Sequence, residues 1–128
     1  MLQIVNQKNT DTNNLLTYYE GFSFRGHYMI VTEILGENLY NYSMDPLFIG
    51  MPRDMLKTVA GQMLNAMKHL RDIRIIHGDL KPENIVFTNE SRKNIKIIDF
   101  GIAQPESRLI HNYVQSRAYR APEVVLGL

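Results

Sequence analysis

Four polar side chains in the second half of the sequence have types and spacings that could act on a phosphate. Asp79 and Asn84 are separated by five positions with Lys81 between them, and Asp99 directly follows the run "KII". A carboxylate can accept the proton of an attacking hydroxyl group, and a lysine can neutralise charge on a moving phosphoryl group. An asparagine oxygen and a second carboxylate are hard ligands that suit Mg²⁺. These residue types therefore favour metal-assisted phosphoryl transfer.

Short apolar runs on both sides of this polar segment predict the elements that hold it. We expect two short strands, at Asn84–Phe87 and Ile95–Ile98, joined by the polar hairpin loop "TNESRKN". A strand–loop–strand unit would hold the polar side chains rigidly, which positional catalysis requires.

The clearest helix is predicted from Arg53 to Arg71, with Pro52 near its start. Apolar residues recur in it at steps of three and four and form one stripe: Leu56, Val59, Met63, Met67 and Leu70. Residues 16–34 favour two strands around a turn at Arg25–His27. The first six residues resemble the tail of a helix, and the chain after Gly101 is expected to stay loop-like as far as "APEVVLGL".

Composition restricts the class of protein. The 128 residues suffice for one domain, 45% hydrophobic content can build a core, and there is no cysteine. The net charge of +1 gives no general attraction to nucleic acid or to acidic membranes, so we expect neither as a partner. No signal peptide or membrane-spanning run is visible. The expected location is intracellular, in the cytoplasm or nucleus.

Three short motifs, in order, carry a family resemblance. "HGDLKPEN" resembles the catalytic loop of protein kinases, "DFG" resembles their metal-binding motif, and "APE" resembles the end of their activation segment. "NYVQSRAYRAPEVVLGL" and "FSFRGHYMIVTEILGENLY" resemble the dual-specificity tyrosine-regulated kinases of the CMGC group, with the homeodomain-interacting kinases next. In that family the arginine of the catalytic loop is replaced by a small or neutral residue, and Gly78 agrees. The resemblance covers nearly the whole chain.

The resemblance implies roles for individual residues. Asp79 matches the catalytic base, Lys81 the lysine that contacts phosphate, and Ser116 a hydroxyl residue that hydrogen-bonds the base. Asn84 and Asp99 match the Mg²⁺ ligands. The residues implied for adenine binding are Thr32 as gatekeeper, Glu33 and Leu35 through their backbone, and Val86 and Ile98 from below. His77 is expected to be structural.

One phosphorylation site is implied by the same resemblance. Tyr113 matches the tyrosine that this family autophosphorylates. Gly78 has no side chain to pair with a phosphate there, so we expect the nearest sequence cations, Arg117 and Arg120, to pair with it. The resemblance also implies ATP and Mg²⁺ as cofactors and a protein as substrate, phosphorylated on Ser or Thr.

The expected fold class is α+β, as a partial protein-kinase-like fold. Residues 1–35 would be the remnant of the small lobe and hinge, and residues 36–128 the first half of the mostly helical large lobe through the "APE" motif. The sequence contains no G-x-G-x-x-G loop and no V-A-I-K-like strand, so we expect it to be truncated at both ends. Two hypotheses remain open: a protein kinase, or an inactive kinase remnant that acts as an interaction module. Exposed apolar surface would favour self-association or a complementing chain.

Overall fold

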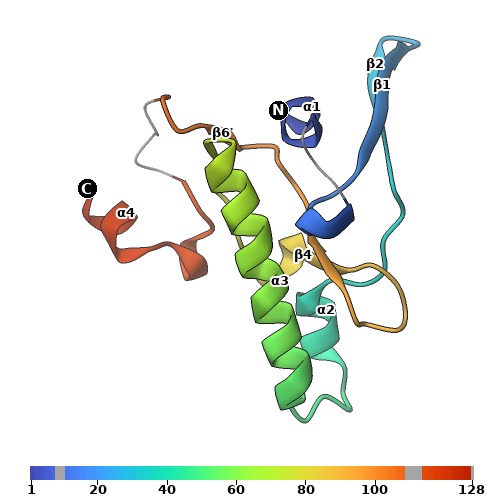
Figure 1. Cartoon of the computed structure of the whole chain (residues 1–128), viewed down its shortest axis with the longest axis vertical. Coiled ribbons are helices and arrows are strands. Elements are labelled where there is room, and N and C mark those ends of the chain that lie inside the picture. The colour runs from blue at the N-terminus through green and yellow to red at the C-terminus, as the bar shows by residue number, and fades with distance from the viewer. Residues whose placement is uncertain (8–10, 109–113, 128) are drawn as a thin grey trace.

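The computed structural model mixes short strands with one long helix (Figure 1). It describes residues 1–7, 11–108 and 114–127. In chain order the elements are α1 (Leu2–Asn6), η1 (Asp11–Asn13), β1 (Tyr18–Phe24), β2 (His27–Thr32), α2 (Leu39–Met44), α3 (Arg53–Asp72), β3 (Ile75–Ile76), η2 (Pro82–Asn84), β4 (Ile85–Phe87), β5 (Ile95–Ile97), β6 (Gln104–Pro105), η3 (Arg117–Tyr119) and α4 (Pro122–Leu126). No helix in the described ranges is long and apolar enough to cross a membrane.

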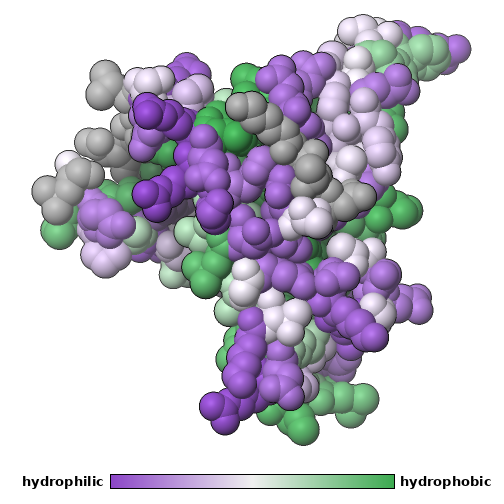
Figure 2. Space-filling view, viewed as in Figure 1, coloured by the Kyte–Doolittle hydropathy of each residue, from purple (hydrophilic) through white to green (hydrophobic). Residues whose placement is uncertain are grey.

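The predicted strand pair is an antiparallel hairpin, β1–β2, that projects from one side of the molecule (Figure 1). Arg25 and Gly26 both have positive φ, 48° and 80°, which is typical of a type I′ turn. Large apolar side chains lie exposed along both strands, among them Phe22, Tyr28 and Ile30. In Figure 2 this ribbon mixes pale, purple and green side chains, with green near its tip and at its outer edge.

Helix α3 crosses the centre of the molecule and supplies one wall of the core (Figure 1). Asp54 lies in its first turn and Arg71 in its last, which suits the helix dipole. Val59, Ala66 and Leu70 are buried. The predicted stripe is only partly covered, because Leu56 is 54% and Met67 is 44% exposed. The helix packs on small two-stranded sheets, and these sheets cover only part of its apolar stripe.

The hairpin β4–β5 is the other wall of the core. Phe87, Ile95 and Ile97 have no exposed surface. Leu15 forms a parallel bridge to Ile97, so the segment before β1 extends this small sheet. The predicted strands at 84–87 and 95–98 are thus observed within one residue at the edges.

The chain after Gly101 is more structured than expected. Gln104 and Pro105 pair with Ile75 and Ile76 as an antiparallel two-residue ladder, β3–β6. The prediction of a loop up to the last segment is therefore wrong here. The sequence of β6 has no apolar alternation that would predict a strand. It forms by pairing with β3, about thirty residues earlier in the chain.

Candidate active site

Asp79 lies in the loop between β3 and η2, and Lys81, Ser116 and Asn84 contact its carboxylate. Lys81 Nζ donates to Oδ2 at 2.7 Å, while the hydroxyl and backbone N–H of Ser116 donate to Oδ1 at 2.7 and 3.1 Å. Burial alone would raise the pKa of Asp79, but the hydrogen bonds from Lys81 and Ser116 outweigh burial and lower it. Asp79 is therefore an anion at neutral pH, available to accept a proton.

Lys81 is the centre of the same cluster. Its Nζ also donates to Ser116 Oγ at 3.1 Å, and the side chain is only 21% exposed. The hydrogen bond to Asp79 raises the pKa of Lys81. The structure thus brings together Asp79, Lys81 and Ser116, although Ser116 is 37 positions from Asp79.

Asn84 and Asp99 are joined through the backbone. Ile98 N–H donates to Asn84 O at 2.9 Å, and Asp99 is the next residue. The Asn84 amide nitrogen donates to Asp79 O at 2.9 Å and to Asp79 Oδ2 at 3.3 Å. Asp99 is exposed, with φ 63°. Such an amide and carboxylate suit Mg²⁺, which takes one or two protein oxygens and completes its shell with water and phosphate.

His77 has the structural role expected for it. The ring is 4% exposed and packs edge-on against Phe100, with ring centroids 5.0 Å apart. Its Nδ1 accepts from Asp79 N–H at 3.2 Å, and its Nε2 lies 2.9 Å from Ile98 O. This pattern requires the neutral tautomer with hydrogen on Nε2, and burial lowers the pKa of His77 accordingly. His77 therefore connects the catalytic loop to the strand end that carries Asp99.

Gly78 has a backbone conformation that favours glycine, with φ 84°. Its carbonyl accepts from Gln115 N–H at 3.0 Å, which docks the segment containing Ser116 onto the loop. Arg120 holds the same segment by donating to the carbonyls of Val114 and Gln115, both at 2.9 Å. Arg117 is exposed at the start of η3. Tyr113, the predicted phosphorylation site, lies outside the described residues.

The five residues predicted to bind adenine line one cavity of about 510 Å³: Thr32, Glu33, Leu35, Val86 and Ile98. Asp99 lines the same cavity, so the candidate metal ligand borders the candidate nucleotide site. Leu16, Asn38 and Asn41 also line it and were missed from sequence. Asn38 is the N-cap of α2 and accepts from Asn41 N–H at 2.7 Å, so the start of this helix forms part of the cavity wall.

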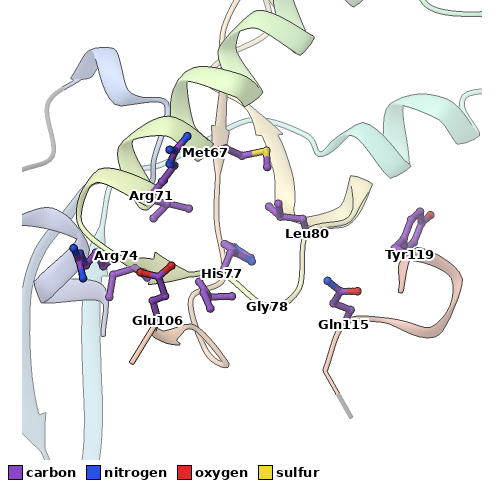
Figure 3. A pocket seen from close by; sticks show the side chains of 12 residues that line it. Met67, Arg71, Arg74, His77, Gly78, Leu80, Glu106, Gln115 and Tyr119 are labelled. Carbon is purple, nitrogen blue, oxygen red and sulfur yellow. The ribbon is translucent and has the colours of Figure 1, made fainter. Parts of the chain in front are cut away.

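A second cavity of about 360 Å³ lies behind the catalytic loop (Figure 3). Its wall combines Met67 and Arg71 of α3, His77 and Gly78 of the loop, and Tyr119 of η3. It shares no lining residue with the cavity that borders Asp99.

Comparison with known proteins places this arrangement in a family. The profile of the protein kinase domain matches residues 2–127, so the chain belongs to that family. It is 44% identical over 118 residues to the serine/threonine-protein kinase ppk5 of Schizosaccharomyces pombe, covering 92% of this chain and 14% of ppk5. It is 39% identical over 114 residues to the DYRK-family kinase pom1 of the same organism, covering 89% of this chain and 10% of pom1. The resemblance to dual-specificity tyrosine-regulated kinases is confirmed.

The fold agrees with a solved kinase. The crystal structure of the PF14_0431 kinase domain superimposes with a TM-score of 0.90 at 28% identity, covering 98% of this chain and 43% of that chain. The expected mixed helix and strand class, as part of a kinase fold, is confirmed. The chain spans about one seventh or less of the length of ppk5 and pom1.

Proposed function

We propose that the chain carries the catalytic-loop half of an ATP-dependent protein kinase that phosphorylates Ser and Thr of protein substrates. The observation that carries this proposal is the position of Asp79, whose carboxylate accepts hydrogen bonds from Lys81, Ser116 and the Asn84 amide. The cavity lined by Asp99 and the predicted adenine residues supports ATP as the phosphoryl donor.

The chemistry follows from these contacts. Asp79 accepts the proton as the substrate hydroxyl oxygen bonds to the terminal phosphorus, and the bond from that phosphorus to the leaving oxygen of ADP breaks. Lys81 lies 2.7 Å from Asp79, so its charge is close to the phosphoryl group at the moment of transfer. Mg²⁺, held by Asn84 Oδ1 and Asp99, would supply charge neutralisation on the phosphates.

We also propose that the chain has two parts and one regulatory phosphorylation site, as expected from the sequence. Residues 1–35 act as small-lobe and hinge sequence and residues 36–128 as the first half of the large lobe. Tyr113 is the autophosphorylated tyrosine, and its phosphate pairs with Arg117 or Arg120, whose guanidinium groups lie on the adjoining segment. Mass spectrometry of the active native gene product that finds no phosphate on Tyr113 would refute this part.

The decisive experiment measures phosphate transfer by the native gene product, purified whole. Radiolabelled ATP with Mg²⁺ and a basic protein acceptor should give incorporation on Ser or Thr, and Asp79→Asn should abolish it. Asp54→Asn is the matched control, because the Asp54 side chain is 98% exposed and its nearest cation is 4.0 Å away. Equal incorporation by wild type and Asp79→Asn would overturn the proposal.

A second candidate function, an inactive interaction module, is favoured by the apolar side chains exposed on β1–β2. It predicts no phosphate incorporation and a self-association or partner complex that is lost when Phe22 and Ile30 are replaced by Ser. Sedimentation of wild type and this double variant would separate the two functions.

A further inference from the structure

We infer that Lys96 is a positioning residue for the nucleotide cavity, acting through Glu33 on the backbone between Thr32 and Leu35. The inference rests on the proposed function, because it assigns this cavity to ATP. In the sequence Lys96 stands in the centre of the apolar strand "IKI", where a lysine would ordinarily point to solvent. In the structure it is only 6% exposed.

The buried amine contacts both Glu33 and Thr17. Lys96 Nζ donates to Glu33 Oε1 at 2.6 Å and to Thr17 Oγ1 at 3.0 Å. Glu33 Oε1 also accepts from Thr17 N–H at 2.6 Å, and Glu33 N–H donates to Thr17 O at 3.1 Å. Burial pushes the pKa of Glu33 up, but the bonds from Lys96 and Thr17 outweigh it, and the pKa lies below its ordinary value. Three segments therefore meet at one ion pair: β5, the residues before β1, and the residues after β2.

The strand register connects this ion pair to the floor of the cavity. Val86 and Lys96 are directly opposed in the β4–β5 ladder, so their side chains leave the same face of the sheet. Ile98 follows two residues later, and successive side chains alternate, so it continues the same row. Val86 and Ile98 line the cavity from this row. Lys96 belongs to the same row and its amine reaches Glu33 of the opposite wall, although Lys96 itself lines a neighbouring cavity.

The opposite wall is the segment that should face adenine. Thr32, Glu33 and Leu35 all line the cavity, and Glu33 is the one whose side chain the ion pair holds. The Leu16 N–H donates to Ile97 O at 3.0 Å, so the segment carrying Thr17 is itself fixed to β5. The Lys96–Glu33 contact therefore joins floor and wall at Glu33. Backbone hydrogen bonds from Gly36 N–H to Phe87 O at 2.8 Å and from Phe87 N–H to Glu37 O at 2.9 Å join them further along the wall.

A purely stabilising role predicts a different outcome from a positioning role. Replacing a buried ion pair by apolar residues of similar volume is often neutral or stabilising, whereas removing one partner leaves an uncompensated charge. If the pair only stabilises the fold, the double variant Lys96→Met/Glu33→Met should recover both stability and ATP binding. If the pair positions the wall, the double variant should recover stability alone.

The test compares four forms of the native gene product: wild type, Lys96→Met, Lys96→Arg and the double variant. Calorimetric titration with Mg·ATP and steady-state kinetics give the dissociation constant, KM and kcat, and thermal unfolding gives Tm. We expect Lys96→Met to raise the dissociation constant and KM for ATP about tenfold with kcat changed less than twofold, since misplacing a positioning group by about 1 Å can cost up to about a hundredfold. Lys96→Arg should restore most of the affinity because it retains the charge and the donor.

The chain offers a control for replacing a lysine that forms an ion pair. Lys68→Met is the matched control, because Lys68 pairs with Asp72 at 3.0 Å while its side chain is 76% exposed. A double variant that regains Tm and stays about tenfold weak for ATP supports the positioning role. Wild-type affinity in Lys96→Met or in the double variant overturns the inference while the proposed function stands. A wild type that binds no ATP overturns the proposed function and the inference together.

Discussion

Replacing Ser116 by Ala should slow phosphate transfer without weakening ATP binding. Ser116 Oγ donates to Asp79 Oδ1 at 2.7 Å and accepts from Lys81 Nζ at 3.1 Å. The variant removes both contacts and keeps the backbone N–H that donates to the same carboxylate oxygen at 3.1 Å. Ser116 does not line the cavity of the predicted adenine residues, so KM for ATP should be unchanged.

The magnitude follows from the kind of bond that is lost. A hydrogen bond to a charged group contributes about 1.5–3 kcal/mol. Each 1.4 kcal/mol changes a rate about tenfold, so a loss of about ten- to a hundredfold is the outer range. Because the backbone N–H of Ser116 still orients Asp79, we expect the lower end, about tenfold in kcat. The pKa of Asp79 should also rise toward its ordinary value, since the hydroxyl is one of the bonds that lower it.

The assay is the pH dependence of kcat for wild type, Ser116→Ala and Ser116→Thr in the native gene product. A base must be deprotonated to accept a proton, so activity is lost as pH falls through its pKa. Ser116→Ala should therefore lose activity at a higher pH than wild type, and Ser116→Thr, which keeps a hydroxyl, should stay close to wild type. Full kcat in the Ala variant, or a Thr variant as slow as the Ala variant, would refute the reasoning.

Three further predictions concern the metal, the buried histidine and the chain in isolation. Asp99→Asn should weaken Mg·ATP binding by about tenfold or more while leaving the fold intact, because the charge that Mg²⁺ prefers is lost; unchanged affinity in a calorimetric titration would count against the assignment. Burial lowers the pKa of His77. As the pH falls below about 6.5, the unfolded chain therefore binds a proton at this residue before the folded protein does, and the folded protein loses stability. The free energy of unfolding of His77→Asn should consequently change less than that of wild type between about pH 7 and 5, and equal slopes in denaturant titrations would contradict this. Residues 1–128 alone should transfer no phosphate, because they contain no glycine-rich loop or small-lobe lysine to hold the phosphates, and each lost charge-stabilising group costs about 10²–10³ in rate. Incorporation above that of an Asp79→Ala control would show this to be wrong.

The catalytic loop could be predicted from sequence because its chemistry is local. Asp79, Lys81 and Asn84 lie within six positions, and the flanking strands follow from short apolar runs. The same holds for the hairpin of β1 and β2, whose turn requires residues that tolerate positive φ. In these places one stretch of chain determines its own conformation.

The remaining features depend on contacts between distant segments. The burial of Lys96 had no signal in the sequence, because periodicity shows which side chains share a face and not which segment covers that face. Periodicity likewise showed the apolar stripe of α3 but not which of its members are covered: Leu56 and Met67 stay exposed. The two strands of the β3–β6 ladder likewise have no sequence pattern that predicts their pairing.

The backbone of Ile98 has a consequence for how this site can vary. Its N–H bonds to Asn84 and its carbonyl to His77, so the catalytic loop is tied to this position through main-chain atoms alone. The Ile98 side chain takes no part in these main-chain bonds and lines the cavity. A smaller or larger apolar residue at position 98 should therefore change which purine analogues fit the proposed nucleotide cavity, without loosening the proposed base or metal ligands. Substitutions of Ile98 can thus change which nucleotide binds, while its backbone keeps the catalytic geometry unchanged.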